Sequence, residues 1–276
     1  MARHAVLHST WLCALTIALA GCGGSGDEAA IVEEFVPPAA VTGPPGGAAP
    51  GPRVPTAPRG TRCLAGRAIS YRDRLRATAV ELLKPTAAFR RPGGAVVSRF
   101  DVLNQNGVPT VFRVLEARAG RDCAPRWYRV QLPIRPNGAT GWIRASGLRL
   151  YRVDTRIEID LSDRRVVVLR GDEVVERVPA AIGKASTPTP TGEYYVNQRL
   201  LTNDPSGPWG PGGIGISAFS PVLVDWEQGG PIAIHGTNQP HTVGKDASFG
   251  CLRVYNADLR RLMELAPPGT PVSIRH

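Results

Sequence analysis

Hydrophobic and polar residues alternate along the second half of the chain in a way that is typical of half-buried β-strands. Ile157, Ile159 and Leu161 are separated by single residues that are polar or charged, so their side chains would share one face of a strand. Turn residues at 162–164 and 170–172 separate this segment from two further apolar runs. We therefore expect three consecutive strands joined by two hairpins, with one face of the sheet buried.

Residues 61–150 show shorter apolar segments that are separated by closely spaced turns. Pro92-Gly93-Gly94 and Asn137-Gly138 are both turn sequences. The strands expected from the pattern are 77–83, 87–89, 95–97, 111–115, 127–132 and 141–143. This arrangement predicts a small all-β barrel.

Two loops and one helix complete the prediction for the second half. Residues 187–192 contain two prolines, and residues 203–220 are rich in Gly, Pro and Ser, so both are expected to be loops, the longer one a lid or a substrate wall. A helix is expected to begin with Asn256 as its cap and to end at Pro267. Its apolar face would consist of Leu259, Leu262, Met263 and Ala266. The predicted fold class is therefore mainly β, with one clear C-terminal helix.

The first 21 residues have the features of a secretory signal. Two basic residues precede an apolar run at 11–20, which is too short to span a bilayer as a mature helix. The sequence Leu19-Ala20-Gly21-Cys22 resembles the lipobox of bacterial lipoproteins. That resemblance implies that Cys22 is lipidated and becomes the new N-terminus, the alternative being a plain signal peptide cleaved nearby.

Residues 22–60 are dominated by Pro, Gly and Ala and carry no apolar period. Such a segment cannot bury enough apolar surface to fold, so we expect a disordered tether. The expected organisation is a signal at 1–21, the tether at 22–60, one domain at 61–150 and a second at 151–276. A lipid anchor and tether would hold the folded part outside the cytoplasm, at the cell envelope.

The chain is basic, with a formal net charge of +10, and almost all of its cations are arginine. Its only lysines are Lys84, Lys184 and Lys245. A basic surface suits an anionic cell wall or lipid headgroups. No lysine-rich run and no patch interleaved with aromatic residues indicates nucleic acid, so we expect no nucleic-acid partner. We expect no cofactor either.

The five cysteines divide by their position in the chain. Cys13 would leave with the signal, and Cys22 would carry lipid. Cys63 and Cys123 both lie in the first half of the folded region and are expected to form a disulfide, which would stabilise the fold by about 4 kcal/mol on the chain-entropy model. Cys251 would then be an unpaired thiol in an exported protein.

Cys251 and His235 together indicate nucleophilic chemistry. His235 follows the apolar run 231–234, so it should lie at the end of a strand. A free thiol is little ionised at neutral pH, and an imidazole can act as its base. A sulfur facing the helix that begins at Asn256 would have a lowered pKa. Ser248 would either orient the imidazole or cap a turn, and the simpler alternative is a buried, inert cysteine beside a structural histidine.

The same residues allow two other uses. His235, His241, Cys251 and Asp246 could supply four zinc ligands, but their spacing matches no zinc signature and no Cys-x-x-Cys pair accompanies them. We therefore expect no bound metal. A protease-like hydrolase would use the same thiol, and the chemistry of the side chains alone leaves it open.

The run from Trp127 to Ile143, with its Asn137-Gly138 turn, resembles the bacterial SH3-like modules that often precede cell-wall enzymes. The resemblance covers about residues 61–150. Trp127 and Trp142 would then either line a groove for a wall peptide or be buried core aromatics.

Three motifs together resemble the catalytic domain of the L,D-transpeptidases of the YkuD family. They are Ile234-His235-Gly236-Thr237-Asn238, Ser248-Phe249-Gly250-Cys251-Leu252-Arg253 and Thr189-Pro190-Thr191-Gly192-Glu193-Tyr194. The resemblance runs from about Arg156 to the C-terminus and implies a mostly β fold. It also implies a cysteine that attacks the peptide bond before the terminal D-residue of a peptidoglycan tetrapeptide stem, and then passes the thioester to an amine on a neighbouring stem.

The resemblance also implies a role for each matching residue. Cys251 would be the nucleophile, His235 the general base, and Ser248 a supporting residue. The backbone N–H groups of Gly250 and Cys251 would stabilise the oxyanion, and Arg253 would pair with a carboxylate of the stem. The remaining members of the expected substrate-binding set are Gly236 and Thr237.

Phe249 departs from the family pattern, because many members carry histidine at this position. The departure puts in question any contribution of a second imidazole to substrate binding. The expected protein is an envelope lipoprotein that cross-links peptidoglycan stems. Two alternatives are an L,D-carboxypeptidase, in which water replaces the acceptor amine, and a non-catalytic lipoprotein that binds the wall through its SH3-like module.

Overall fold

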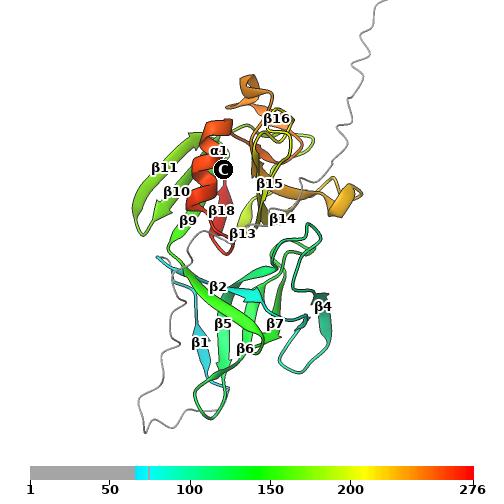
Figure 1. Ribbon diagram of the computed structural model, residues 1–276, viewed down its shortest axis with the longest axis vertical. Helices are drawn as coiled ribbons and strands as arrows, with labels where there is room; N and C mark the ends of the chain where they lie inside the picture. The colour runs from blue at the N-terminus through cyan, green and yellow to red at the C-terminus, as the bar shows by residue number, and fades with distance from the viewer. Residues whose placement is uncertain (1–65, 74) are drawn as a thin grey trace, which may run out of the picture. The chain divides into compact units, whose positions relative to one another are not determined.

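The computed structural model describes residues 66–73 and 75–276 of the chain (Figure 1). The expected signal at 1–21, the tether at 22–60, and both Cys22 and Cys63 lie outside the described residues. Two eight-stranded sheets, each with its own apolar core, make up most of the described part. The prediction of a mainly β fold with one α-helix in the C-terminal part is confirmed.

The first sheet is formed by the strands before residue 154. They are β1 (Ala68–Ser70), β2 (Ala77–Leu82), β3 (Thr86–Phe89), β4 (Val96–Phe100), β5 (Val111–Ala119), β6 (Pro125–Gln131), β7 (Thr140–Arg144) and β8 (Leu148–Val153). Their order is β4-β3-β7-β6-β5-β2-β8, and β1 pairs with β5. Gly93 and Gly138 both have a positive φ, at +71° and +79°, in the turns that join β3 to β4 and β6 to β7. Both turn predictions are therefore confirmed.

The second sheet contains most of the remaining strands. They are β9 (Thr155–Asp160), β10 (Arg165–Arg170), β11 (Glu173–Pro179), β13 (Gly192–Leu201), β14 (Gly212–Phe219), β15 (Pro231–His235), β17 (Leu252–Arg253) and β18 (Pro271–Arg275). The order is β11-β10-β9-β18-β13-β14-β15-β17. A separate two-stranded sheet joins β12 (Ile182–Gly183) to β16 (Asp246–Ser248), and η1 (Glu227–Gly229) and η2 (Pro240–Thr242) are single 3₁₀ turns.

The strands β9, β10 and β11 form the two hairpins that the alternating pattern predicts. Antiparallel pairing joins β9 to β10 and β10 to β11. Ile157 and Ile159 of β9 and Val166 and Val168 of β10 are all buried in one core cluster. A side chain of this size gains roughly 1.5–3 kcal/mol when it is fully buried, so this shared face stabilises the register of the meander.

The prediction of one long loop over 203–220 is wrong, because Gly212–Phe219 is strand β14 in the interior of the second sheet. The glycines in this segment suggested a loop, but in the structure they let neighbouring side chains approach the strand closely. A Cβ on Gly215 would come 2.6 Å from the side chain of Gln198, and a Cβ on Gly213 would come 3.1 Å from the ring of Trp209. Glycine in a strand often marks such a close approach of neighbouring groups. The loop at 187–192 is found as predicted up to Gly192, where β13 begins.

Helix α1 (Asn256–Leu265) is present, but the predicted cap is wrong. Tyr255 is the N-cap residue, and its side chain makes no capping hydrogen bond. Asn256 is instead the first helical residue. Leu259 and Leu262 are fully buried in the core of the second sheet, as the periodicity predicts. Figure 1 shows α1 lying over the strands of this sheet.

Two further findings bear on the expectations for export. Cys123 is disulfide-bonded, and because Cys63 lies outside the described residues, their pairing stays a prediction. Among the helices of the described residues, none has the length and apolar character needed to cross a membrane.

Candidate active site

The two central residues of the candidate site lie at the ends of neighbouring parallel strands. The apolar run that forms β15 ends at His235, and β17 pairs with it so that Ile234 is opposite Leu252 and His235 is opposite Arg253. Cys251 directly precedes β17. Because side chains alternate along a strand, the register places Cys251, Arg253 and His235 on the same face of this strand pair. The pairing therefore brings residues that are far apart in the sequence to one face of the sheet.

The imidazole of His235 is held in one orientation. The side chain is 6% exposed, and Nδ1 donates a hydrogen bond to the carbonyl oxygen of Gly236 at 2.6 Å. The ring of Trp209 covers it, with centroids 4.3 Å apart. Since Nδ1 carries the hydrogen, Nε2 is the nitrogen with a free lone pair. Burial lowers the pKa of His235 to about 4, so the ring is neutral at neutral pH.

Cys251 is a free thiol. Its sulfur lies 3.9 Å from the carbonyl oxygen of Pro231 on β15. Burial raises the pKa of the thiol, and the N–H of Ala233 and the charge of Arg253 oppose that effect without reversing it. The expectation of a lowered pKa at the helix N-terminus is therefore wrong, because desolvation of the thiolate outweighs the favourable contacts.

Ser248 shapes the turn that presents the thiol. Its side chain is buried, and Oγ donates to the carbonyl oxygen of Cys251 at 2.5 Å while it accepts the N–H of Gly250 at 3.1 Å. The sequence left two roles open for Ser248, and these hydrogen bonds correspond to the second, in which the side chain caps a turn. The Gly250 N–H already has an acceptor in this arrangement, so the predicted oxyanion pair retains only the N–H of Cys251 in the structure as it stands.

The turn is also tied to the loop at 187–192, which the sequence motif did not explain. The hydroxyl of Thr187 donates to the carbonyl oxygen of Ser248 at 3.1 Å, and that of Thr189 donates to the carbonyl oxygen of Gly250 at 2.9 Å. Both threonines are buried. The two Thr-Pro steps thus fix the backbone of the cysteine turn, and their buried hydroxyls are satisfied.

The residues after His235 form a hydrogen-bonded turn. Thr237 donates its N–H to Oδ1 of Asn256 at 2.8 Å, and its hydroxyl accepts the N–H of Gln239 at 2.9 Å. Gln239 in turn accepts a hydrogen bond from Nη1 of Arg253 at 3.1 Å. Sequence reasoning missed Asn256 here, because its place at a helix start suggested a cap.

Phe249 lies at the exposed edge of the site. Its ring is 38% exposed and lies 5.6 Å from the ring of Trp226, while Nζ of Lys184 lies 5.3 Å from its centroid. Phe249 is two residues before Cys251, so this aromatic pair and cation lie at the turn that carries the thiol. Neither Trp226 nor Lys184 carries a sequence signal of its own that would have identified it.

Two side chains from the first sheet hold the loop that carries Trp226. Nη2 of Arg135 donates to the carbonyl oxygens of Ser220 and Gly229, each at 2.7 Å. The amide of Asn137 donates to the carbonyl oxygen of Phe219 and accepts its N–H, both at 2.9 Å. Both ends of the loop 220–230 are therefore fixed to the β6–β7 turn.

The residues proposed for zinc do not assemble. Asp246 forms an ion pair with Arg164 at 2.7 Å. Within 66–73 and 75–276, no group of three or more His, Cys, Asp and Glu side chains is arranged to hold a metal ion. The zinc alternative therefore gains no support from the geometry.

Comparisons with known proteins decide the family. A family model described as the L,D-transpeptidase catalytic domain, YkuD, matches residues 154–274. YkuD of Bacillus subtilis, whose curated name assigns it provisionally as an L,D-transpeptidase, is 32% identical over 124 residues, which are 45% of this chain and 68% of that protein. The chain belongs to the YkuD family of L,D-transpeptidases. The match includes every residue of the candidate site.

Two further proteins are similar to the same part of the chain. YkuD of Bacillus licheniformis, named in the same provisional way, is 35% identical over 119 residues, which are 43% of this chain and 64% of that protein. A solved structure from Bdellovibrio bacteriovorus is 26% identical, with a TM-score of 0.36, and the similarity covers 45% of this chain and 48% of that one. The family match begins at residue 154, so the strands β1–β8 lie before it.

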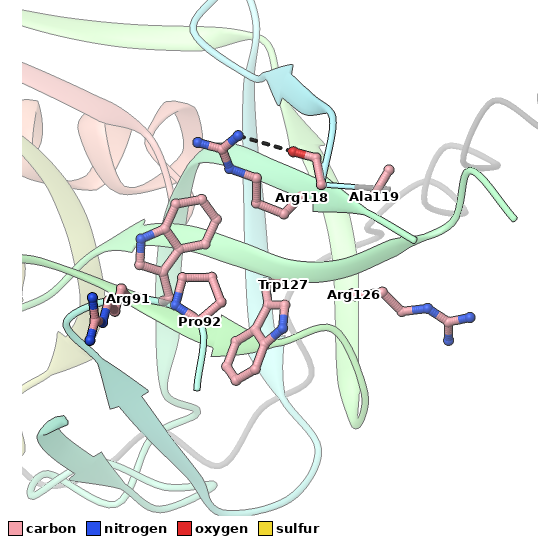
Figure 2. A pocket seen from close by; sticks show the side chains of 8 residues that line it. Arg91, Pro92, Arg118, Ala119, Arg126 and Trp127 are labelled. Atoms are coloured by element: carbon pink, nitrogen blue, oxygen red, sulfur yellow. Dashed lines mark hydrogen bonds between the residues drawn. The ribbon is translucent and has the colours of Figure 1, made fainter. Parts of the chain in front are cut away.

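The strands before the L,D-transpeptidase match contain a pocket of about 590 Å³ beside Trp127 and Trp142 (Figure 2). Its lining residues are Gly66, Arg91, Pro92, Arg118, Ala119, Arg126, Trp127 and Trp142. The guanidinium of Arg118 lies 5.6 Å from the ring of Trp142, and that of Arg144 lies 4.7 Å from the ring of Trp127. Trp142 is buried. Arginine stacking on both indoles favours the interpretation of structural aromatics over that of a peptide groove.

Proposed function

We propose that this protein is a peptidoglycan L,D-transpeptidase that acts through a thioester on Cys251. The pairing of β15 with β17 carries the proposal, because it brings a neutral imidazole with a fixed tautomer and a free thiol to one face within the family match. This arrangement has the parts that acyl transfer needs: a nucleophile, a base, and a group that orients the base.

The two pKa shifts define how the first step proceeds. Burial lowers the pKa of His235 to about 4 and raises that of Cys251, so both groups are neutral before substrate binds. The thiol proton must therefore move to Nε2 of His235 as the sulfur attacks. The C–S bond forms at the carbonyl carbon of the third residue of the donor stem, and the negative charge develops on its oxygen.

The remaining steps return the protein to its starting state. The imidazolium of His235 gives its proton to the nitrogen of the terminal D-residue as the C–N bond breaks, which leaves a thioester on Cys251. An amine of a neighbouring stem then attacks the thioester carbon, and His235 takes a proton from that amine. The new peptide bond forms as the sulfur leaves and is protonated again.

Residues around the thiol supply the supporting roles. Ser248, Thr187 and Thr189 hold the turn that carries Cys251 by hydrogen bonds to its backbone. The N–H of Cys251 is the proposed donor to the oxyanion. Arg253, fixed through Gln239, is the proposed partner of a stem carboxylate.

The parts of the chain before the family match are proposed to serve localisation. A signal at 1–21, lipid on Cys22 and a tether at 22–60 would hold the SH3-like domain at 61–150 and the catalytic domain at 151–276 outside the cytoplasm, next to the wall. Incorporation of labelled palmitate that is lost in Cys22→Ala would support the anchor. Incorporation that persists in that variant would contradict it.

Product analysis tests the function. The full-length protein is incubated with tetrapeptide-containing muropeptides, and the products are separated and weighed. Cross-linked dimers that disappear in Cys251→Ala support transfer, whereas tripeptides without dimers would indicate the carboxypeptidase.

A second measurement determines the mass of the protein after treatment with a carbapenem. The wild-type protein should gain the mass of the drug, and a folded Cys251→Ala variant should not. A wild-type protein that gains no mass would favour the non-catalytic wall-binding alternative.

A further inference from the structure

A single peptide unit connects helix α1 to the imidazole of His235. The carbonyl oxygen of Gly236 accepts the hydrogen bond from Nδ1 of His235 at 2.6 Å. The N–H of Thr237, which belongs to the same peptide unit, donates to Oδ1 of Asn256 at 2.8 Å. The side chain of Asn256 and the ring of His235 therefore hold the two ends of one peptide group.

We propose that Asn256 is a positioning residue for the general base, and that it fixes the orientation and tautomer of His235 through the Gly236–Thr237 peptide. The inference rests on the proposed function for its catalytic meaning, but the geometry it invokes is independent of the substrate. Asn256 itself touches neither the thiol nor any reacting atom in this arrangement.

The hydrogen-bond chain explains why the effect would reach the imidazole. A peptide group cannot rotate its C=O without rotating its N–H, because the unit is planar. An acceptor on the N–H therefore fixes the direction of the C=O that binds Nδ1. Hydrogen bonds in such a chain also polarise one another, so the Asn256 acceptor strengthens the carbonyl of Gly236 as an acceptor. Both effects favour the tautomer with hydrogen on Nδ1 and a lone pair on Nε2.

The side-chain amide of Asn256 lies close to the backbone of two glycines. A Cβ on Gly210 would come 2.1 Å from Oδ1 of Asn256, and a Cβ on Gly236 would come 2.4 Å from it. A side chain on either glycine would therefore displace the amide of Asn256. The position of the helix start is fixed as well, because the N–H of Val254 donates to the carbonyl oxygen of His235 at 2.9 Å.

A purely helical role does not account for the amide. Asn256 is the first residue inside the helix, after the N-cap Tyr255, and asparagine is a weak helix former. Its one hydrogen bond given by the structure leads away from the helix to Thr237. The amide of Asn256 therefore contributes its hydrogen bond to the peptide that follows His235.

The test compares three variants in the full-length protein. Asn256→Leu keeps the approximate size but removes the acceptor. Asn256→Asp keeps an oxygen acceptor in the same place. Asp258→Asn is the control, since Asp258 lies in the same helical turn but pairs with Arg261, whereas the two polar groups of the Gly236–Thr237 peptide are bonded to His235 and Asn256. Thermal unfolding confirms that each variant is folded, and Asn256→Ala replaces the leucine variant if that one is not.

Two measurements are made on each variant. The first is the tautomer of His235, from ¹⁵N NMR couplings of the ring. The second is the rate of acylation by a carbapenem and the kcat for stem peptides. Asn256→Leu should shift His235 toward a mixture of tautomers and reduce the acylation rate by about tenfold or more, as expected for losing one buried hydrogen bond. Asn256→Asp should keep the wild-type tautomer and most of the rate, and the control should match wild type.

A folded Asn256→Leu protein with the wild-type tautomer would overturn the inference, and so would a folded aspartate variant that behaves like the leucine variant. Failure of the proposed function looks different. In that case wild type would show no acylation and no transfer, while the tautomer would still respond to Asn256→Leu.

Discussion

Thr189 donates a hydrogen bond from its hydroxyl to the carbonyl oxygen of Gly250 at 2.9 Å, and the same hydroxyl oxygen accepts the N–H of Gly183 at the same distance. One buried side chain thus joins β12 to the residue that precedes the proposed nucleophile. The position of Cys251 depends on a loop that lies about sixty residues earlier in the chain.

Replacing Thr189 with valine tests this connection. The variant keeps the shape of the side chain but leaves the N–H of Gly183 and the carbonyl of Gly250 without this partner, so we expect a loss of about 1–3 kcal/mol in the free energy of unfolding. Acylation of Cys251 by a carbapenem should also slow. Urea unfolding and mass spectrometry measure the two effects. Thr191→Val, on an exposed position of the same loop, is the matched control, and equal effects in the two variants would contradict the assignment.

The buried histidine makes stability depend on pH. The pKa of His235 is about 4 in the folded protein against 6.5 for the ordinary side chain, so the unfolded chain binds the proton more readily. Stability that is present above about pH 6.5 should therefore fall as the pH is lowered toward 4. The contribution is about 3 kcal/mol, since one pKa unit corresponds to about 1.4 kcal/mol.

Denaturant unfolding at pH 7 and pH 4.5 in wild type and His235→Gln isolates this contribution. Glutamine does not titrate, so the variant should lose less stability than wild type over this interval. Equal losses in the two proteins would show that His235 is not protonated on unfolding. A fall in wild-type stability on raising the pH from 5 to 7 would have the wrong sign for this effect.

The bonds from Arg135 and Asn137 to the loop 220–230 predict that the first sheet influences the site. Asn137→Ala removes both bonds to Phe219, which should destabilise the protein by about 1 kcal/mol or more. It should also increase proteolytic cleavage within the loop and slow acylation of Cys251, because Trp226 would no longer be held beside Phe249. Arg90→Ala, at an exposed position directly after β3, should leave all three properties unchanged. Unchanged loop proteolysis in Asn137→Ala would contradict the role of these bonds.

Sequence patterns predicted the elements whose buried positions repeat within one short segment of the chain. The hairpins of β9, β10 and β11 and the helix at 256–265 follow from alternation and helical periodicity, because their buried faces repeat at fixed spacing. Strand β14 did not follow from its pattern, since Gly215 is required by the side chain of Gln198 on the neighbouring strand β13 and Gly213 by the ring of Trp209. For the same reason Asn256 suggested a cap, although its partner is Thr237.

The sequence by itself determined the chemical groups at the candidate site: a thiol at Cys251, an imidazole at His235, and motifs that place both in the L,D-transpeptidase family. Only the tertiary structure decided their state. The choice of Nδ1 as the protonated nitrogen depends on the Gly236 carbonyl, and the direction of both pKa shifts depends on burial. Desolvation and hydrogen bonding act through space between groups that the chain brings together only when it folds, so no local pattern contains them.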